Sequence, residues 1–329
     1  MSDTTENLIR STALTYAGSA KQLLKVFHRH NKSLPDIYIF SLPRSGSTLL
    51  AEILNTDPET KTASESFALN KDNLHVLKNY FQEDFLSERY TDISSREFRS
   101  VISYYSALSE GKTRNAYYWS DLLTGHHRFH TSRTLFKTHK MTYHFDDLMR
   151  HFQNDFGIYL MRNPIAVSLS RIRMGWSTYI EQYKDALKLA DFISNELTQT
   201  IETIEKNGTA LEKQVLSWCL ENAVYLKNKR QRTMPDNVIP VFYEDLILNP
   251  KKTLRAICSK TGMEFHPDML KMIARPSSGI IHSQKDVRKQ ILAGNNLYLV
   301  NRWKEEVDKH SLLRIEDLLK KFGYDFYLS

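Results

Sequence analysis

The hydrophobic residues of this chain gather in four short runs, and longer stretches of helical periodicity separate them. The first run, Ile37–Phe40, is wholly apolar and rich in β-branched and aromatic residues, as in a strand that is buried on both faces. Residues 134–138, 157–161 and 238–243 predict three further short strands. Because helical segments separate these strands, we expect a three-layer α/β fold, with a central, mainly parallel sheet flanked by helices.

Apolar residues at helical spacing predict the remaining elements. Residues 5–32 form an amphipathic pattern with a basic end, which could contact a membrane or a partner, although such helices more often pack on their own domain. Residues 276–300 are polar with scattered Lys and Arg, and they predict a flexible segment. Other helices are expected over residues 70–88, 95–109, 179–206, 209–231, 250–261 and 315–322, with one more beginning near Ile165.

The chain shows no linker that would mark a second large domain. We therefore expect an N-terminal helical extension over residues 1–34 and a single α/β domain over residues 35–329, with the break at Ser33–Pro35. A length of 329 residues with 41% hydrophobic and 25% charged residues fits one large domain of this kind.

The charge balance is basic, with 45 Lys and Arg against 38 Asp and Glu, which gives a net charge of +7. This excess fits an anionic ligand or a solvated basic surface, and without a clustered patch or a motif it does not indicate nucleic-acid binding. The two cysteines, Cys219 and Cys258, lie in amphipathic patterns and predict buried free thiols. No apolar stretch has the length of a membrane span, and no signal-peptide pattern opens the chain, so we expect a cytoplasmic protein.

A turn of small residues follows the first strand and precedes a helix. Arg44, Ser45, Gly46, Ser47 and Thr48 supply backbone N–H groups, hydroxyls and one guanidinium at that turn. A strand, a small loop and a helix N-terminus in this order typically bind a phosphate. The turn is not a Walker A loop, because the first glycine is missing and the cation precedes the turn.

A second candidate anion site follows the third strand. Arg162 comes directly after that strand, and Ser170 lies about two helical turns further on. An arginine and a hydroxyl placed in this way can bind a second phosphate. Ligands bind beyond the carboxyl ends of parallel strands, so the two sites are expected to share one edge of the sheet.

Two anion sites on such a sheet suit a nucleotide that carries phosphate at both ends, and here the sequence resembles the sulfotransferase family. That resemblance implies a P-loop-like fold and the donor 3′-phosphoadenosine 5′-phosphosulfate (PAPS), with no metal requirement. It rests on the segments 43–49, 162–170 and 243–250, with weaker likeness around Trp303 and Gly323. The residues that it implies for donor binding are Arg44, Ser45, Gly46, Ser47, Thr48, Arg162, Ser170 and Tyr243.

The resemblance also implies catalytic roles. Arg44 would contact the 5′-phosphate and the leaving oxygen, and Lys137 would neutralise charge in the transition state. Either His139 or Glu65 would accept the proton of the acceptor: His139 matches the base of cytosolic sulfotransferases, and Glu65 matches the position of the catalytic carboxylate in protein-tyrosine sulfotransferases. Tyr243 would contact the adenine or support the 3′-phosphate site.

The expected reaction is sulfuryl transfer to a hydroxyl of a carbohydrate, a lipid or a small molecule. Two departures from the cytosolic group are present: Arg44 replaces the usual lysine, and the basic motif near the C-terminus of that group is missing. Two alternatives remain open, a P-loop kinase-like enzyme that uses ATP and a nucleotide-binding protein of the same fold that has lost catalysis.

Overall fold

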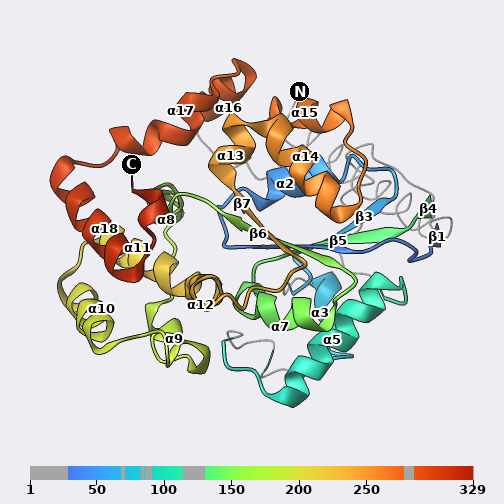
Figure 1. Cartoon of the computed structure of the whole chain (residues 1–329), viewed down its shortest axis with the longest axis horizontal. Coiled ribbons are helices and arrows are strands. Elements are labelled where there is room, and N and C mark those ends of the chain that lie inside the picture. Colours follow the sequence, from blue (N-terminus) through green and yellow to red (C-terminus); the bar gives the residue numbers. More distant parts are fainter. Residues whose placement is uncertain are drawn as a thin grey trace, which may run out of the picture.

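The chain folds around a sheet of five parallel strands in the order β3-β5-β2-β6-β7 (Figure 1). The structure is a computed structural model that describes residues 29–67, 71–82, 85, 91–113, 130–277 and 285–328. The predicted parallel sheet and its four predicted strands are confirmed. The five strands are β2 (Ile37–Ser41), β3 (Thr60–Ser64), β5 (Arg133–Thr138), β6 (Phe156–Met161) and β7 (Val238–Phe242).

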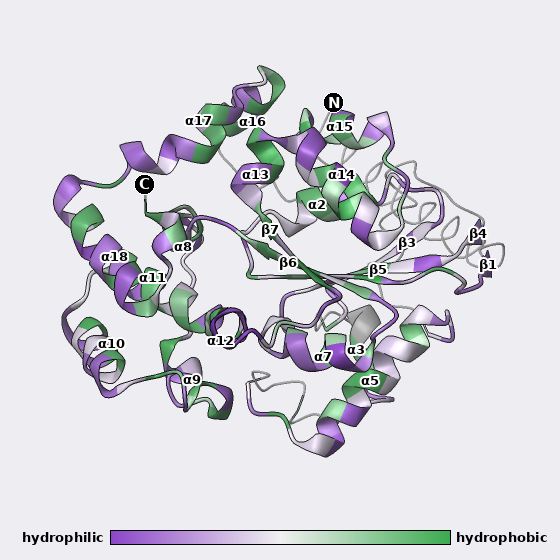
Figure 2. Ribbon diagram, viewed as in Figure 1, coloured by the Kyte–Doolittle hydropathy of each residue, from purple (hydrophilic) through white to green (hydrophobic). Residues whose placement is uncertain are grey.

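The central strand β2 divides the interior into two layers. Successive side chains of a strand point to opposite faces, so Ile37 and Ile39 enter one hydrophobic cluster while Tyr38 and Phe40 enter the other. All four side chains are fully buried. Figure 2 shows the same concentration of apolar residues on the neighbouring strands β6 and β7.

Helices cover both faces of the sheet, as the α/β prediction requires. One face packs against α2 (Ser47–Leu54), α13 (Tyr243–Leu248), α14 (Pro250–Thr261) and α15 (Pro267–Ile273). The other face packs against α3 (Lys71–Leu77), α5 (Ser95–Ser109), α7 (Phe145–His151) and α12 (Ala223–Gln231). The helix predicted over residues 250–261 is confirmed, and Gly262 ends it with a φ of 66°.

A third cluster of helices packs beyond the β7 side of the sheet, around the fully buried Trp218. The stretches predicted as two long helices are interrupted there, because Ser194 caps a new helix within the first and Asn222 ends a helix within the second. The helices of this cluster are α8 (Pro164–Arg173), α9 (Ile180–Tyr183), α10 (Asn195–Asn207), α11 (Ala210–Glu221) and α18 (Lys309–Phe322). Short 3₁₀ turns cover Thr142–His144, Leu187–Leu189, Arg302–Glu305 and Asp325–Tyr327.

The structure also differs from the sequence-based predictions in the segment 276–300 and at strand β3. The segment 276–300, expected to be flexible, contains the helices α16 (Lys285–Leu292) and α17 (Asn296–Asn301). Strand β3 was missed because its sequence is polar, yet four of its five residues are buried. Its Lys61 is accommodated because the ammonium group donates to the carbonyl oxygen of Leu108 over 2.8 Å.

The N-terminal prediction is tested only at its end. Residues 1–28 lie outside the described part of the chain, and Arg29–His30 form strand β1, which pairs with β4 (His130–Thr131), so the expected helix does not extend to residue 32. The division into an extension and a domain stays a prediction. Cys219 and Cys258 are buried and free, as predicted. Among the described residues, no helix has both the length and the apolar composition needed to cross a bilayer.

Candidate functional site

A cavity of about 460 Å³ lies where the central strands end, and it collects most of the predicted site residues. Its lining includes the loop after β2, the end of β5, the start and end of α8, and the C-terminal helices α16 and α17. Six cationic and two acidic side chains line it among the described residues. The cations are Arg44, Lys137, Arg162, Arg173, Arg275 and Arg302, and the acids are Glu65 and Glu306.

The loop between β2 and α2 brings backbone close to the cavity. Arg44 and Gly46 both have positive φ, 75° and 94°, which closes the turn tightly. Gly46 is the N-cap of α2 and offers no side chain to the first N–H groups of the helix, so that these groups stay available to an anion. Gly46, Ser47 and Thr48 line the cavity, whereas Ser45 is buried and its N–H donates to the carbonyl oxygen of Leu42.

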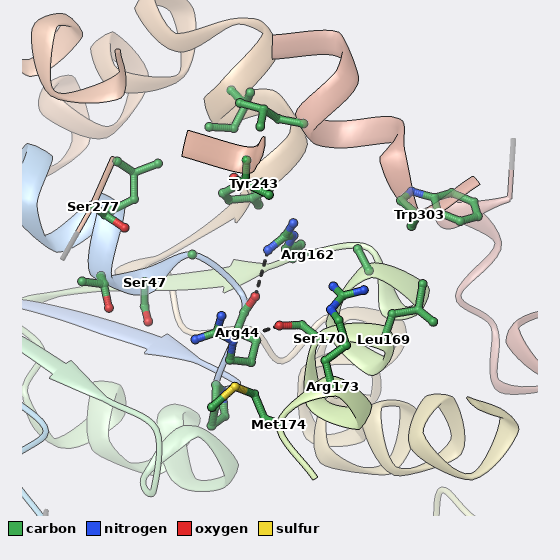
Figure 3. Close-up of a pocket in the computed structure, with 18 of the residues that line it drawn as sticks. Arg44, Ser47, Arg162, Leu169, Ser170, Arg173, Met174, Tyr243, Ser277 and Trp303 are labelled. Carbon is green, nitrogen blue, oxygen red and sulfur yellow. Dashed lines mark hydrogen bonds between the residues drawn. The ribbon is translucent and has the colours of Figure 1, made fainter. Parts of the chain in front are cut away.

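The two predicted anion sites lie against each other (Figure 3). The Nε of Arg44 donates to the hydroxyl of Ser170 over 3.0 Å, and Nη1 of Arg162 donates to the carbonyl oxygen of Arg44 over 3.1 Å. The guanidinium of Arg162 also lies 4.3 Å above the ring centre of Tyr243. The structure therefore brings together four residues that sequence reasoning assigned to donor binding.

These arginines are an incompletely neutralised cluster. The pKa of Arg44 is lowered by burial and by the neighbouring charges of Arg162 and Arg173. Arg173 and Arg302 share the carboxylate of Glu306, whose oxygens lie 2.5 and 3.4 Å from their nitrogens. A bound anion beside Arg44 would relieve the repulsion, so the cluster favours a strongly anionic ligand.

A second group, made of Glu65, Lys137 and His139, lies at the adjacent ends of β3 and β5. One oxygen of Glu65 is 2.8 Å from the ammonium of Lys137 and 2.9 Å from Nε2 of His139. Lys137 also donates to the hydroxyl of Thr48 over 3.1 Å. Nδ1 of His139 lies 2.7 Å from the carbonyl oxygen of Ser41, which can only accept a hydrogen bond.

The surroundings of Glu65 determine its protonation. Burial by itself would raise the pKa of this carboxyl group, but the charges and hydrogen bonds of His139 and Lys137 lower the pKa to about 2. Glu65 is therefore an ionised carboxylate at neutral pH. Glu65 directly follows β3. Its φ of 48° lies in the left-handed region, which is unusual for a residue other than glycine.

The segment that begins at Tyr243 has a supporting role that sequence reasoning missed. Glu244 accepts the N–H of Asn163 over 2.9 Å. The side-chain oxygen of Asn163 in turn accepts the N–H groups of Ile165 and Ala166 and caps α8. Glu244 therefore holds the start of the helix that carries Ser170, next to Arg162.

Other lining residues were also missed. Arg173 and Trp176 follow Ser170 closely in the sequence, and this proximity to a predicted site residue is the local signal that could have identified them. Arg302 and Trp303 come from the C-terminal part of the chain, where the weak family likeness around Trp303 was the only signal and assigned no role to either residue. Among the described residues, no three His, Cys, Asp or Glu side chains gather as a metal site would require, and the metal-free reaction stays a prediction.

We expect Gly46→Ala to disrupt this site. A β-carbon at residue 46 would lie 2.4 Å from Cδ2 of Tyr243, and alanine at a φ of 94° costs about 1–2 kcal/mol in addition. Gly262→Ala is the matched control, because its φ is also positive while its β-carbon would meet nothing within 4 Å. Urea denaturation should show a clearly larger loss of stability for Gly46→Ala; equal losses would mean that Tyr243 moves aside freely.

We also expect the stability that Glu65 contributes to disappear in acid. Its pKa is lowered by folding, so this contribution is complete above the unfolded pKa of about 4.3 and is lost as the pH falls towards 2. The size is up to about 3 kcal/mol. Urea denaturation of the wild type and Glu65→Gln at pH 7, 4 and 2.5 measures it, with the exposed Glu264→Gln as a control. A stability difference that stays constant with pH would contradict the ion pairing.

Comparison with known proteins identifies the family of this chain. The sequence profile described as "Sulfotransferase family" matches residues 35–267, more than half of the chain. A mouse sulfotransferase, SULT7A1, solved in complex with PAP, is 16% identical with a TM-score of 0.43, and the match covers 92% of this chain and 89% of that one. A sulfotransferase domain from the curacin biosynthetic pathway is 17% identical with a TM-score of 0.44, over 88% of this chain and 99% of that one. On the strength of the family profile, this chain belongs to the sulfotransferase family.

Proposed function

We propose that this protein transfers a sulfuryl group from PAPS to a hydroxyl of its acceptor. The observation that carries the proposal is the direct contact between the two anion sites, through the hydrogen bonds that join Arg44 to Ser170 and Arg162 to Arg44. PAPS carries about four negative charges, divided between its 5′ and 3′ ends. A cavity of about 460 Å³ lies within the usual size range for ligands of this size, roughly 300–1,000 Å³.

The nucleotide end of the donor is assigned to the Arg162 side of the cavity. Arg162 and Ser170 would bind the 3′-phosphate, and the N–H groups at the start of α2 would bind the 5′-phosphate with Arg44. Tyr243 supports Arg162, since the guanidinium already covers one face of its ring. The resemblance left two roles open for Tyr243, contact with the adenine and support of the 3′-phosphate site. The contact with Arg162 favours the second role.

An ATP-using kinase-like activity is less well supported. Such enzymes hold magnesium with hydroxyl and carboxylate oxygens beside the phosphates. The two carboxylates that line the described part of this cavity, Glu65 and Glu306, are both engaged in ion pairs with cations. The cavity therefore offers mainly donors, which suit a highly anionic donor that is bound by cations and N–H groups.

Glu65 is the base that the geometry favours over His139. Both ring nitrogens of His139 are engaged within the protein, Nδ1 with the carbonyl oxygen of Ser41 and Nε2 with an oxygen of Glu65. Neither nitrogen is therefore left over to contact the hydroxyl of an acceptor. Glu65 keeps free lone pairs, and His139 orients its carboxylate.

The transfer step follows from these positions. The acceptor oxygen forms a bond to sulfur while the bond between sulfur and the 5′-phosphate oxygen breaks, and adenosine 3′,5′-bisphosphate (PAP) leaves. Arg44 and Lys137 neutralise the charge that develops on the leaving oxygen and the sulfuryl oxygens. When Lys137 turns from Glu65 to these oxygens, the pKa of Glu65 rises and the carboxylate becomes a better proton acceptor. The acceptor class, a carbohydrate, lipid or small-molecule hydroxyl, stays a prediction, as does a cytoplasmic location.

Donor binding is tested by comparing PAP with ATP and magnesium in a thermal-shift assay. We expect PAP to stabilise the wild type, and Arg162→Ala to weaken PAP binding by roughly 10- to 150-fold, because charge-assisted hydrogen bonds contribute about 1.5–3 kcal/mol. Arg255→Ala is the control, since that arginine lies over Phe265 and does not line the cavity. Preference for ATP, or no response to either nucleotide, would overturn the proposed function.

The base assignment predicts different losses for two substitutions. Glu65→Gln should lower sulfuryl transfer by roughly 10²–10⁴-fold, whereas His139→Asn, which keeps a donor towards Ser41, should lose less. PAP release from labelled PAPS with a panel of hydroxyl acceptors measures the rates, and PAP affinity checks that the donor site is intact. A near-native rate for Glu65→Gln together with an inactive His139→Asn would reverse the assignment.

A further inference from the structure

Helix α11 carries a stripe of buried polar residues that does not reach the cavity. Gln214, Ser217 and Glu221 are spaced i, i+3 and i+7, so they lie on one face of the helix. All three are nearly inaccessible to solvent, although α11 is surrounded by the apolar cluster around Trp218. Buried polar groups persist where each satisfies a specific partner, and here the partners lie in one short segment.

Each residue of the stripe binds a different point of the segment that follows Ser170. Glu221 forms a two-pronged ion pair with the fully buried Arg171, with nitrogen–oxygen distances of 2.5 and 3.1 Å. Ser217 accepts the N–H of Tyr179 over 2.8 Å and donates to Glu221 over 3.0 Å. Gln214 donates to the carbonyl oxygen of Trp176 over 2.7 Å. The segment between Arg171 and Tyr179 is therefore attached to α11 at three points.

This attached segment forms one wall of the cavity. Met174 and Trp176 both line it. In Figure 3, Met174 lies on the opposite side of Arg44 from Arg162 and Tyr243. The proposed function assigns the nucleotide end of the donor to Arg162 and Tyr243, so the wall at Met174 and Trp176 faces the region left for the acceptor.

We propose that Gln214, Ser217 and Glu221 are positioning residues that fix the acceptor-side wall of the cavity, at residues 174–179, without touching the donor. This inference rests on the proposed function for the identity of that wall. The chemistry of the stripe supports it. A buried ion pair seldom stabilises a fold more than packed apolar residues would, and its directional bonds instead specify one geometry. The side-chain oxygen of Gln214 has no hydrogen-bond partner among the described residues. Burying this oxygen unpaired costs stability, and a leucine at that position would avoid the cost.

The wall would also keep water from the donor. If water replaces the acceptor, its oxygen bonds to sulfur, the bond between sulfur and the 5′-phosphate oxygen breaks, and PAP and sulfate are released together with the two protons of the water. Closed active sites suppress such hydrolysis by excluding water. A looser wall should therefore raise the rate of PAPS hydrolysis in the absence of any acceptor, while leaving the affinity for PAP unchanged.

The test uses Gln214→Leu and Ser217→Ala in the full chain. Both substitutions replace a polar side chain with an apolar one, and both avoid the unpaired buried charge that a change at Glu221 would create at Arg171. Lys213→Ala is the matched control, because it is one position from Gln214 on α11 and about 100° around the helix axis. Three quantities are measured: amide hydrogen exchange in residues 171–180, PAP affinity, and acceptor-free PAP release from labelled PAPS.

We expect amide exchange in residues 174–179 to become about 5- to 10-fold faster in both variants, as the loss of one hydrogen bond implies. PAP affinity should stay within about twofold of the wild type, and hydrolysis should rise severalfold; Lys213→Ala should match the wild type in all three measurements. Unchanged exchange in the segment, or a loss of PAP affinity equal to the change in hydrolysis, would overturn the inference. If the wild type itself fails to bind PAP, the proposed function is wrong, and the exchange rates alone decide whether the stripe holds the segment.

Discussion

The complete burial of strand β2 is the constraint on which the rest of the structure depends. Its alternating side chains enter two separate hydrophobic clusters, so the strand cannot shift by one residue without exchanging the contents of both clusters. Its register with β5 and β6 is fixed in the same way. As a result, the loop after Ser41 always emerges beside the ends of β5 and β6. Lys137, His139 and Arg162 reach the loop from those neighbouring strands.

A stable frame is needed because the site itself is electrostatically unfavourable. Burial lowers the pKa of Arg44, and the nearby charges of Arg162 and Arg173 lower it further. Such an arrangement does not stabilise the folded state. It persists because the surrounding sheet and α8 hold the side chains in place. When an anion binds, the repulsion among the arginines is relieved, and this relief contributes to the free energy of binding. Strongly anionic ligands gain most from this arrangement, and neutral ligands gain little.

Sequence reasoning found those parts of the site whose signals are local. The turn at Arg44 and the arginine–serine pair at Arg162 and Ser170 each combine a strand end with a helix start, and the structure places them together. The residues that it missed depend on tertiary structure. Strand β3 is buried although its sequence is polar. Its Lys61 donates to a buried carbonyl oxygen, and no local sequence pattern reveals that partner. The helices α16 and α17 carry so many polar residues that the segment suggests flexibility, although Ile291 and Leu299 are buried.

The same limit applies to the roles of individual residues. The sequence allowed either His139 or Glu65 to be the base, since each matches a different group of relatives. The choice stays a prediction, and our preference for Glu65 rests on the contact between His139 and the carbonyl oxygen of Ser41, a backbone atom with no signature in the side-chain sequence. Glu244 likewise belongs to a motif in the sequence, but its contribution to the site is that it accepts a hydrogen bond from the backbone N–H of Asn163. Contacts with backbone atoms support both assignments, and the sequence alone does not reveal such contacts.

The pairing of β3 with β5 has a consequence for how this fold can be modified. Ser64 pairs with Lys137, and Thr60 pairs with Arg133, so the two strands are parallel: the chain leaves the sheet at its carboxyl end, beside Glu65, and enters β5 at the opposite end, at Arg133. The long excursion between these two points contains α3 and α5, which bury Leu77, Val101 and Leu108 in the core. The parts of it that are exposed can change in length and sequence, because longer loops add little entropic cost. Protein engineers could therefore use Glu65 and Arg133 as crossover points for chimaeras, exchanging the segment between them among relatives while Glu65 keeps its place in the cavity.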